Sequence, residues 1–400
     1  MGAVALEYAH DQELNIKEPK WLTYLMCVYI FLSYFETYLT VFIGTSTKYF
    51  LLGLIGLMFG SMHFKFQLRS NVKMFVAWFL FKLSSVLWAS FSSMHNGDFN
   101  LHFLSQVGMV MFLLALDGSD HTEHFISTII HVSFWCSFLF GVLSIFFPRA
   151  YINEVYAARQ VLTLWGQQND PNNCAAYLSV GCVLAMYSLI VMHQKRVLNT
   201  VVLIVNTIAL FMTSSRGGLV TIACMLVLLI VLPNHEDKQH HNGILRKFAL
   251  TAVLTVVGIW LITKYVPAAS FDRLIDFKDY EGGSGRSVRW EVAFDLISQR
   301  PIFGWGWGGY NIGFGAIHNT FLTSLCDVGV VGTCLLLSPM INLVVKSIKR
   351  RDVLAICLLV VGLAPTLFLD AINKRFFWNS IIIAILIDSY TIRTGKLVKL

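Results

Sequence analysis

The chain has 400 residues, of which 56% are hydrophobic and 13% are charged, and its formal net charge at pH 7 is +7. A globular domain carries about 25% charged residues, so this composition excludes an ordinary soluble protein. The many aromatic and β-branched residues exclude a disordered chain, and continuous apolar runs exclude a transmembrane β-barrel. We therefore expect an all-α, polytopic membrane protein.

Apolar runs along the chain predict about 12 transmembrane helices, since one span requires about 20 apolar residues. The runs fall near 21–43, 48–64, 72–91, 101–116, 124–147, 172–192, 197–213, 216–232, 248–266, 319–345, 353–369 and 376–392. A polar segment, 1–20, precedes this membrane domain of 21–400, and we expect no cleavage because it lacks a clear A-x-A-like site. A long loop, 265–318, separates the ninth span from the tenth.

Lysine and arginine residues predict the orientation, because they concentrate in short cytoplasmic loops. With the N-terminus in the cytoplasm, most of them fall on the cytoplasmic side and few in the short outer segments. Both termini are then cytoplasmic. Arg216, the loop 265–318 and the segment 148–171, which contains Arg159, all face outward.

The eight cysteines lie almost entirely within apolar runs, and no pair has CxxC spacing. A metal or redox site would require paired spacing. We therefore interpret the cysteines as small packing residues and expect no metal site.

Arg216 lies between two apolar runs, in the sequence Ser214-Ser215-Arg216-Gly217-Gly218. One interpretation is an interfacial anchor whose side chain reaches the lipid headgroup phosphates. The adjacent glycines favour a second one, in which backbone or ligand approaches closely.

The outer loop contains a predicted amphipathic helix at 287–298, where Trp290, Phe294 and Ile297 recur at helical spacing. Such a helix would lie on the membrane surface. Arg286 and Arg289 fall in or beside its first turn. Two guanidinium groups and the free N–H groups of a helix start suit a phosphate group, which could equally belong to a lipid headgroup.

A glycine-rich segment, 304–310, follows this helix and lacks the residues of a nucleotide-binding loop. We interpret it as a flexible turn that presents Trp305, Trp307 and Tyr310. These rings would form an interfacial aromatic belt or a stacking platform for sugar rings.

His318 follows at the start of the next apolar run. With an ordinary pKa of about 6.5, its imidazole is mostly neutral at pH 7 and able to accept a proton. The alternative is a purely structural histidine. Its position on the same outer surface as the arginines favours group transfer from a phosphate ester. Glu36 and Lys82 lie within predicted spans, and the sequence shows no partner for either.

Five sequence elements resemble the O-antigen polymerase and ligase superfamily of membrane proteins. They are DPNNCAAYL at 170–178, SSRGG at 214–218, GRSVRW at 285–290, PIFGWGWGGY at 301–310 and HNTFLTSLCDVGVVG at 318–332. The resemblance covers roughly residues 150–345. Because the elements occur in order and on one predicted membrane side, they are more specific together than singly.

The resemblance implies an inverting, metal-independent glycosyltransferase without a cofactor, on the outer face of the bacterial inner membrane. Arg216 and Arg286 match the arginines that hold the diphosphate, and His318 matches the histidine that activates the acceptor hydroxyl. Asp327 stands where many members have Glu, which leaves the role of that acid open. Arg289 is offset from the motif arginine, so its role as a substrate-binding candidate rests on its place in the predicted helix and not on the resemblance. The further substrate-binding candidates are Arg159, Asn319, Trp305 and Tyr310.

The implied donor is a glycan linked to undecaprenyl diphosphate. In a polymerase of O-antigen, capsule or exopolysaccharide the acceptor is another lipid-linked repeat unit, and in a ligase it is lipid A–core. Membrane lipids and a chain-length regulator protein are further expected partners, and nucleic acid is not. We favour the polymerase. A secondary transporter is the alternative from another class, but it would place polar residues at the midplane of repeated, broken helices. An inactive scaffold is a third possibility.

Overall fold

The computed structural model describes residues 19–44, 69–89, 98–117, 120–152, 159–232, 286–310 and 316–398, with short pieces in 53–57 and 247–264. The first helices are α2 (Lys20–Ile43), α4 (Ser70–Ser84, continued by the 3₁₀ turn η1, Ser85–Trp88), α5 (Asp98–Asp117) and α6 (Glu123–Phe146). Next come α7 (Pro171–Tyr187, continued by the π turn η2, Ser188–Met192), α8 (Arg196–Met212) and α9 (Arg216–Val231). The last are α12 (Arg286–Gln299), α13 (Thr320–Arg350), α14 (Val353–Leu363, continued by the 3₁₀ turn η4, Ala364–Leu367) and α15 (Arg375–Thr394).

The chain is a helical membrane protein, as the composition predicts. Within the described residues, 5 helices are long and apolar enough to cross a bilayer: α2, α6, α7 with η2, α13 and α15. Shorter apolar helices coincide with most of the other predicted spans. The predicted spans 48–64 and 248–266 lie largely outside the described residues, so the number of twelve stays a prediction.

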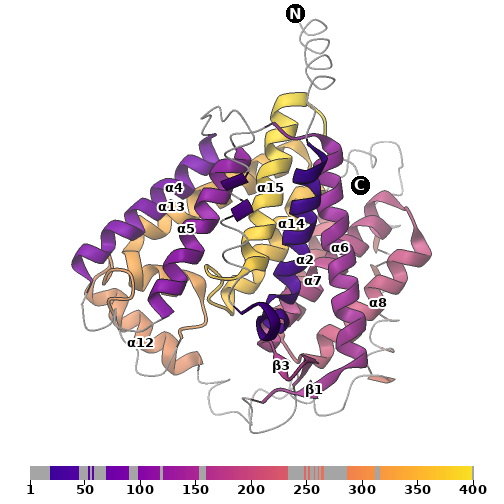
Figure 1. Ribbon diagram of the computed structural model, residues 1–400, viewed down its shortest axis with the longest axis horizontal. Coiled ribbons are helices and arrows are strands. Elements are labelled where there is room, and N and C mark those ends of the chain that lie inside the picture. The colour runs from indigo at the N-terminus through magenta and orange to yellow at the C-terminus, as the bar shows by residue number, and fades with distance from the viewer. Residues whose placement is uncertain are drawn as a thin grey trace, which may run out of the picture.

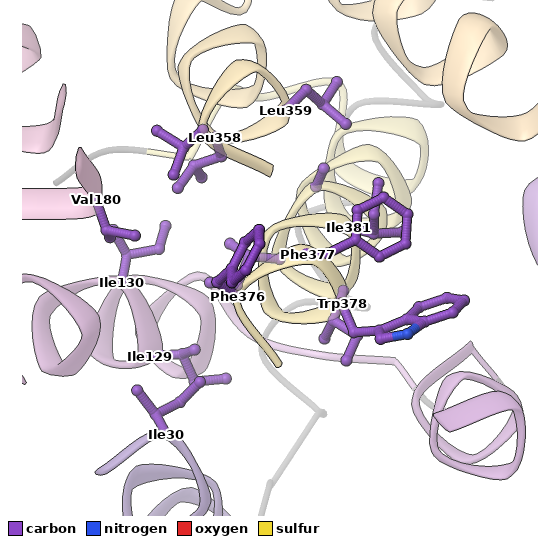
Figure 2. Close-up of a cluster of buried hydrophobic side chains, with 14 of the residues drawn as sticks. Ile30, Ile129, Ile130, Val180, Leu358, Leu359, Phe376, Phe377, Trp378 and Ile381 are labelled. Atoms are coloured by element: carbon purple, nitrogen blue, oxygen red, sulfur yellow. The ribbon is translucent and has the colours of Figure 1, made fainter. Parts of the chain in front are cut away.

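Helix α15 is the central helix of the bundle (Figure 1). In the most apolar stretch of this helix, 89% of the residues are buried. Figure 2 shows Phe376, Phe377 and Trp378 of α15 among side chains of α2, α6, α7 and α14. Since lipid tails are as apolar as these side chains, close packing and not water exclusion holds the helices together in a membrane.

Two ion pairs join distant helices; the first is buried, and the second is partly buried, with the Glu36 side chain 23% exposed. The Lys82 ammonium on α4 lies 3.2 Å from the Asp327 carboxylate on α13, with side-chain exposures of 4% and 6%. Arg375, which begins α15, lies 3.3 Å from Glu36 of α2. Charges inside a membrane protein are costly unless they are paired. These pairs supply the partners of Lys82 and Glu36 that the sequence does not reveal.

The glycine-rich segment is an ordered turn that packs against a break in α13. Gly329 has φ 62° inside that helix, and a Cβ there would lie 2.3 Å from the carbonyl oxygen of Ile302. The N–H of Trp305 donates to the carbonyl of Cys326 (2.8 Å), and that of Gly306 donates to the carbonyl of Asp327 (2.8 Å). The prediction of a flexible turn is therefore wrong, because the freed carbonyl groups of α13 bind its backbone.

Trp307 is buried and not part of an aromatic belt or a sugar-stacking platform. It is 5% exposed, and the Lys82 ammonium lies 4.7 Å from its ring centroid. Its backbone N–H donates to the Ser85 hydroxyl at 2.9 Å. The second tryptophan of the segment thus anchors the turn to α4 and η1.

A small antiparallel sheet connects α6 to α7 and was not predicted. Its strands are β1 (Pro148–Ala150), β2 (Gln160–Leu164) and β3 (Gln167–Gln168), in the order β1-β2-β3. The sheet lies at the same end of the bundle as α12 (Figure 1). That arrangement agrees with the placement of 148–171 and the loop 265–318 on one membrane side.

The helix predicted at 287–298 is confirmed as α12 (Arg286–Gln299), whereas its position on the membrane surface stays a prediction. Its Trp290 and Ile297 pack around Ala293, together with Ile317 and residues from the start of α13. Phe294, on another face, is 57% exposed. Much of the predicted apolar face is therefore covered by protein, and Phe294 remains available to lipid.

All eight cysteines have free thiols, and most of them are buried. The packing role predicted for them is confirmed for the buried ones. Cys224 and Cys334 are exposed.

Removal of either residue of the Lys82–Asp327 ion pair, which joins α4 to α13, should strongly destabilise the protein. Lys82→Ala should cost about 3–5 kcal/mol of unfolding free energy, because it leaves a buried carboxylate without its cation. The double variant Lys82→Met, Asp327→Leu should recover most of that loss. Thermal unfolding in detergent measures both.

The matched control is Arg69→Ala, which breaks a more exposed pair with Asp120 (27% and 50% exposed). It should change the stability by less than about 1 kcal/mol. Equal effects of Lys82→Ala and Arg69→Ala would contradict the importance of the buried pair.

Candidate active site

Helices α9 and α13 begin in the same way. In each, a residue with left-handed backbone precedes the N-cap: Ser214 with φ 49° and His318 with φ 57°. The N-cap Ser215 accepts a hydrogen bond from the N–H of Gly218 at 3.4 Å. Side-chain caps of this kind satisfy N–H groups of a helix that would otherwise lack a partner. Arg216 is therefore the first residue of α9, directly beside the cap.

Asn319 caps α13 with its side-chain oxygen. That oxygen accepts from the N–H groups of Phe321 (3.0 Å) and Leu322 (3.1 Å). The side-chain amide also donates to the carbonyl of Leu367 at 3.1 Å. Because both polar atoms of Asn319 are used within the protein, the geometry favours a structural role over the predicted contact with substrate.

Both helix starts lie against the connection between α14 and α15. Asn319 binds Leu367, and the hydroxyl of Thr320 donates to the carbonyl of Leu369 at 2.7 Å. From α9, a Cβ at Gly217 would lie only 3.1 Å from a ring carbon of Phe368. The segments that carry Arg216 and His318, far apart in sequence, therefore meet on one short connection, whereas the sequence analysis predicts only that they share the outer surface.

The Asp-Pro-Asn element at the start of α7 joins the same assembly. Asp170 is the N-cap of α7, and Pro171 occupies the first helical position, which needs no N–H donor. The amide oxygen of Asn172 accepts from the guanidinium of Arg159 (2.9 Å) and from the hydroxyl of Ser215 (2.9 Å). Asn172 thereby connects α7 to the cap of α9.

Arg159 is buried, at 8% exposure. Besides Asn172, it donates to the carbonyl of Thr213 at 2.9 Å. Its guanidinium thus fixes the loop before Arg216. This geometry explains why the segment 148–171 approaches the site, and it favours a positioning role for Arg159.

Helix α12 is tied to the chain just before His318. The Arg289 guanidinium donates to the carbonyl of Ala316 at 3.3 Å, and the indole N–H of Trp290 donates to that of Ile317 at 3.2 Å. Arg289 is half-buried. Arg286 begins α12, but its side chain lies outside the described residues.

Trp305 and Tyr310, the remaining substrate-binding candidates, are both held by protein groups. The indole N–H of Trp305 donates to the carbonyl of Leu296 at 2.9 Å, and the Arg300 guanidinium lies 4.2 Å from its ring centroid. Tyr310 packs with the cluster between α12 and α13, and burial raises the pKa of its phenol. Both residues support the loop that leads to His318.

The assembly includes Arg159, Arg216 and Arg289 together with the N-termini of α7, α9 and α13. A helix N-terminus carries a partial positive charge. Arrangements of this kind bind phosphate groups. Within the described ranges, no group of three or more His, Cys, Asp or Glu is placed to hold a metal ion.

Asp370 is an acidic group that the sequence analysis missed. Burial raises the pKa of its carboxyl to about 6, an effect that Lys82 opposes and Asp327 strengthens. It lies in the connection that receives α9 and α13. An aspartate between two apolar runs is the only signal in the sequence, and no motif surrounds it.

Residues 199–337 match a family model described as O-antigen ligase. The match confirms the resemblance to the O-antigen polymerase and ligase superfamily over the part of the chain that contains Arg216, Arg286 and His318. It supports an activity of the O-antigen ligase or polymerase type on glycans. The Asp-Pro-Asn element and Arg159 precede the matched residues. A search of curated proteins gave no match to the chain.

Removal of the acceptor at Asn172 should disorder the start of α9. Asn172→Ala leaves Arg159 and Ser215 without this acceptor, and we expect a loss of about 1–3 kcal/mol in stability together with reduced glycan transfer. Asn172→Asp keeps an acceptor and should restore most of both. Thermal unfolding and a glycan ladder measure the two effects; an alanine variant with wild-type behaviour would refute this role.

Asp370 should make the stability depend on pH. Its pKa in the folded protein, about 6, exceeds the ordinary value of 3.8, so the folded state binds more protons than the unfolded state between these values. The contribution of the protonated Asp370 carboxyl to the free energy of unfolding is complete below pH 3.8 and is lost as the pH rises through 6. Compared with the wild type, Asp370→Asn should show a smaller decline in unfolding temperature from pH 4 to pH 7. Asp295→Asn, at an exposed position of α12, should retain the full decline, and an equal decline in all three proteins would contradict the assignment.

Proposed function

We propose that the protein is a membrane glycosyltransferase that polymerises repeat units linked to a polyprenyl diphosphate, on the outer face of the bacterial cell membrane. The observation that carries the proposal is the meeting of α9 and α13 on the connection between α14 and α15. It places Arg216 and His318 at neighbouring helix starts. A phosphate-binding group and a proton acceptor are the two parts that glycan transfer from a diphosphate requires.

In the proposed reaction, the hydroxyl oxygen of an acceptor sugar attacks the anomeric carbon of the donor glycan. The hydroxyl proton passes to an imidazole nitrogen of His318. The bond between the anomeric carbon and the diphosphate oxygen breaks, and the diphosphate leaves with the electron pair. Attack opposite to the leaving group inverts the anomeric centre.

Arg216 and Arg286 would stabilise the charge that develops on the leaving diphosphate. Charge-assisted hydrogen bonds from guanidinium forks suit its oxygen atoms, and N–H groups at helix starts add donors. Preorganised donors of this kind stabilise the transition state without reorganisation. Because the diphosphate is already a good leaving group, the proposed reaction needs no nucleotide or metal ion.

The other candidates take supporting roles in this proposal. Arg159 and Asn319 position Arg216 and His318 through the contacts described above. Trp305 and Tyr310 fix the loop between α12 and α13. Arg289 remains a candidate for a direct contact with the glycan or the diphosphate, because it lies beside the segment 316–318 and is half-buried.

The backbone of His318 supports a functional interpretation. A residue other than glycine rarely adopts left-handed φ, and such a conformation persists only when the surrounding structure enforces it. Both neighbours of His318 are fixed by hydrogen bonds: the Asn319 side chain caps α13, and the indole N–H of Trp290 donates to the carbonyl of Ile317. The imidazole is thus presented from a fixed backbone.

A ligase is the second candidate, since the matching family model is described as O-antigen ligase. It would use the same groups with lipid A–core as acceptor. A purified assay that offers lipid A–core and a second lipid-linked repeat unit in parallel distinguishes the two activities.

Substitution of the reactive groups should abolish the glycan ladder in cells. His318→Ala should reduce transfer by about 10²–10⁴-fold, and Arg216→Ala by about 10–100-fold. The glycan profile, at protein levels matched by immunoblot, measures both. For a polymerase we expect single repeat units; for a ligase, long chains should accumulate on the carrier lipid.

The control is His124→Ala, at an exposed position near the start of α6, which should leave the ladder unchanged. An unchanged ladder in His318→Ala would refute the catalytic role. It would favour a transporter or a scaffold.

A further inference from the structure

A polar pocket lies among α2, α5, α7 and the start of α15. Its volume is about 220 Å³. Its wall includes Glu36, Asn169, Asn173, Lys374 and Arg375. So many charged and amide groups are costly within a membrane protein unless they serve a function.

The pocket borders the candidate active site through the first turn of α7. Asn172 binds Arg159 and Ser215, whereas the next residue, Asn173, lines the pocket together with Asn169. The two sites therefore share one helix start but use different side chains of it. A ligand held near Arg216 and a ligand in the pocket would be separated by that helix turn.

Part of the hydrogen-bonding capacity of the wall is satisfied internally. Arg375 pairs with Glu36 at 3.3 Å, and the Asn173 amide donates to the side-chain oxygen of Asn169 at 3.1 Å. The polar groups that remain accessible from the pocket belong to its half-buried residues, among them Glu36, Asn169 and Lys374.

The wall offers hydrogen-bond donors and acceptors together, and this combination restricts the ligand. A phosphate or sulfate would lie near the Glu36 carboxylate, and a metal cation would meet Lys374 and Arg375. A lipid chain would leave the polar groups of the wall without hydrogen-bond partners, which is costly in a buried site. A sugar hydroxyl both donates and accepts.

We propose that this pocket binds one sugar of the glycan that is transferred, and so selects the repeat unit. The identity of the glycan rests on the proposed function, whereas the preference for a hydroxyl-rich ligand rests on the pocket itself. Sites that hydrogen-bond a substrate hydroxyl reject analogues that lack it much more strongly than apolar pockets reject a change of size. The pocket would thus give the enzyme a means to distinguish sugars.

Binding of two soluble probes to the purified, full-length protein tests the proposal. The first is the oligosaccharide released by mild acid from the lipid-linked repeat units of the host, and the second is inorganic diphosphate. Asn173→Ala should weaken binding of the oligosaccharide by about tenfold or more and leave binding of diphosphate unchanged. Arg216→Ala should weaken binding of diphosphate and spare the oligosaccharide.

Lys374→Ala and Thr37→Val change half-buried residues of the pocket wall. They decide the question if Asn173→Ala fails to fold, and each should weaken oligosaccharide binding. Arg149→Ala, at an exposed position of β1, is the control and should bind both probes normally.

The pocket proposal is overturned if the wild-type protein does not bind the oligosaccharide, or if the folded pocket variants bind it normally. Normal diphosphate binding by Arg216→Ala would instead contradict the proposed role of that arginine. If the pocket variants still failed to bind the oligosaccharide in that case, the proposal of a sugar-binding pocket would hold even without a role for Arg216. The two probes thus separate the two proposals.

Discussion

The carbonyl groups of Leu367 and Leu369, where η4 ends and the chain turns toward α15, organise the candidate active site. Backbone carbonyl groups within a membrane protein require hydrogen-bond partners from the protein, because water is scarce there. Asn319 and Thr320 at the start of α13 supply those partners. The same contacts that satisfy the connection therefore fix the position of His318, and Phe368 in this connection contacts the start of α9.

Several polar residues of the sequence motifs support the candidate site through contacts with other protein groups. Asn172, Ser215 and Asn319 use their side chains to cap helices or to connect them. The tryptophans of the glycine-rich segment anchor it to α4 and α12. Such sites need many fixed neighbours for few reactive groups, because transition-state stabilisation depends on donors already held in position.

The outcome for individual elements shows how far sequence reasoning reaches. The helix at 287–298 followed from periodicity, and the spans near 216–232 and 319–345 followed from hydropathy; the structure has helices at all three places. The meeting of the helix starts at Arg216 and His318 was predicted only as a shared membrane side. The glycine-rich segment was misinterpreted, because its conformation depends on the break at Gly329 of another element. Asp370 has no motif around it, and its position between two apolar runs is its only signal in the sequence.

The sequence by itself determined the membrane environment and the approximate positions of most described helices. These features depend on hydropathy and on neighbours within about four positions in the chain. Only the tertiary structure decided that Lys82 pairs with Asp327, that Glu36 pairs with Arg375, and that Asn173 lines a polar pocket. Those contacts join residues on different helices, and their geometry follows from how the helices pack, which no local pattern in the chain specifies.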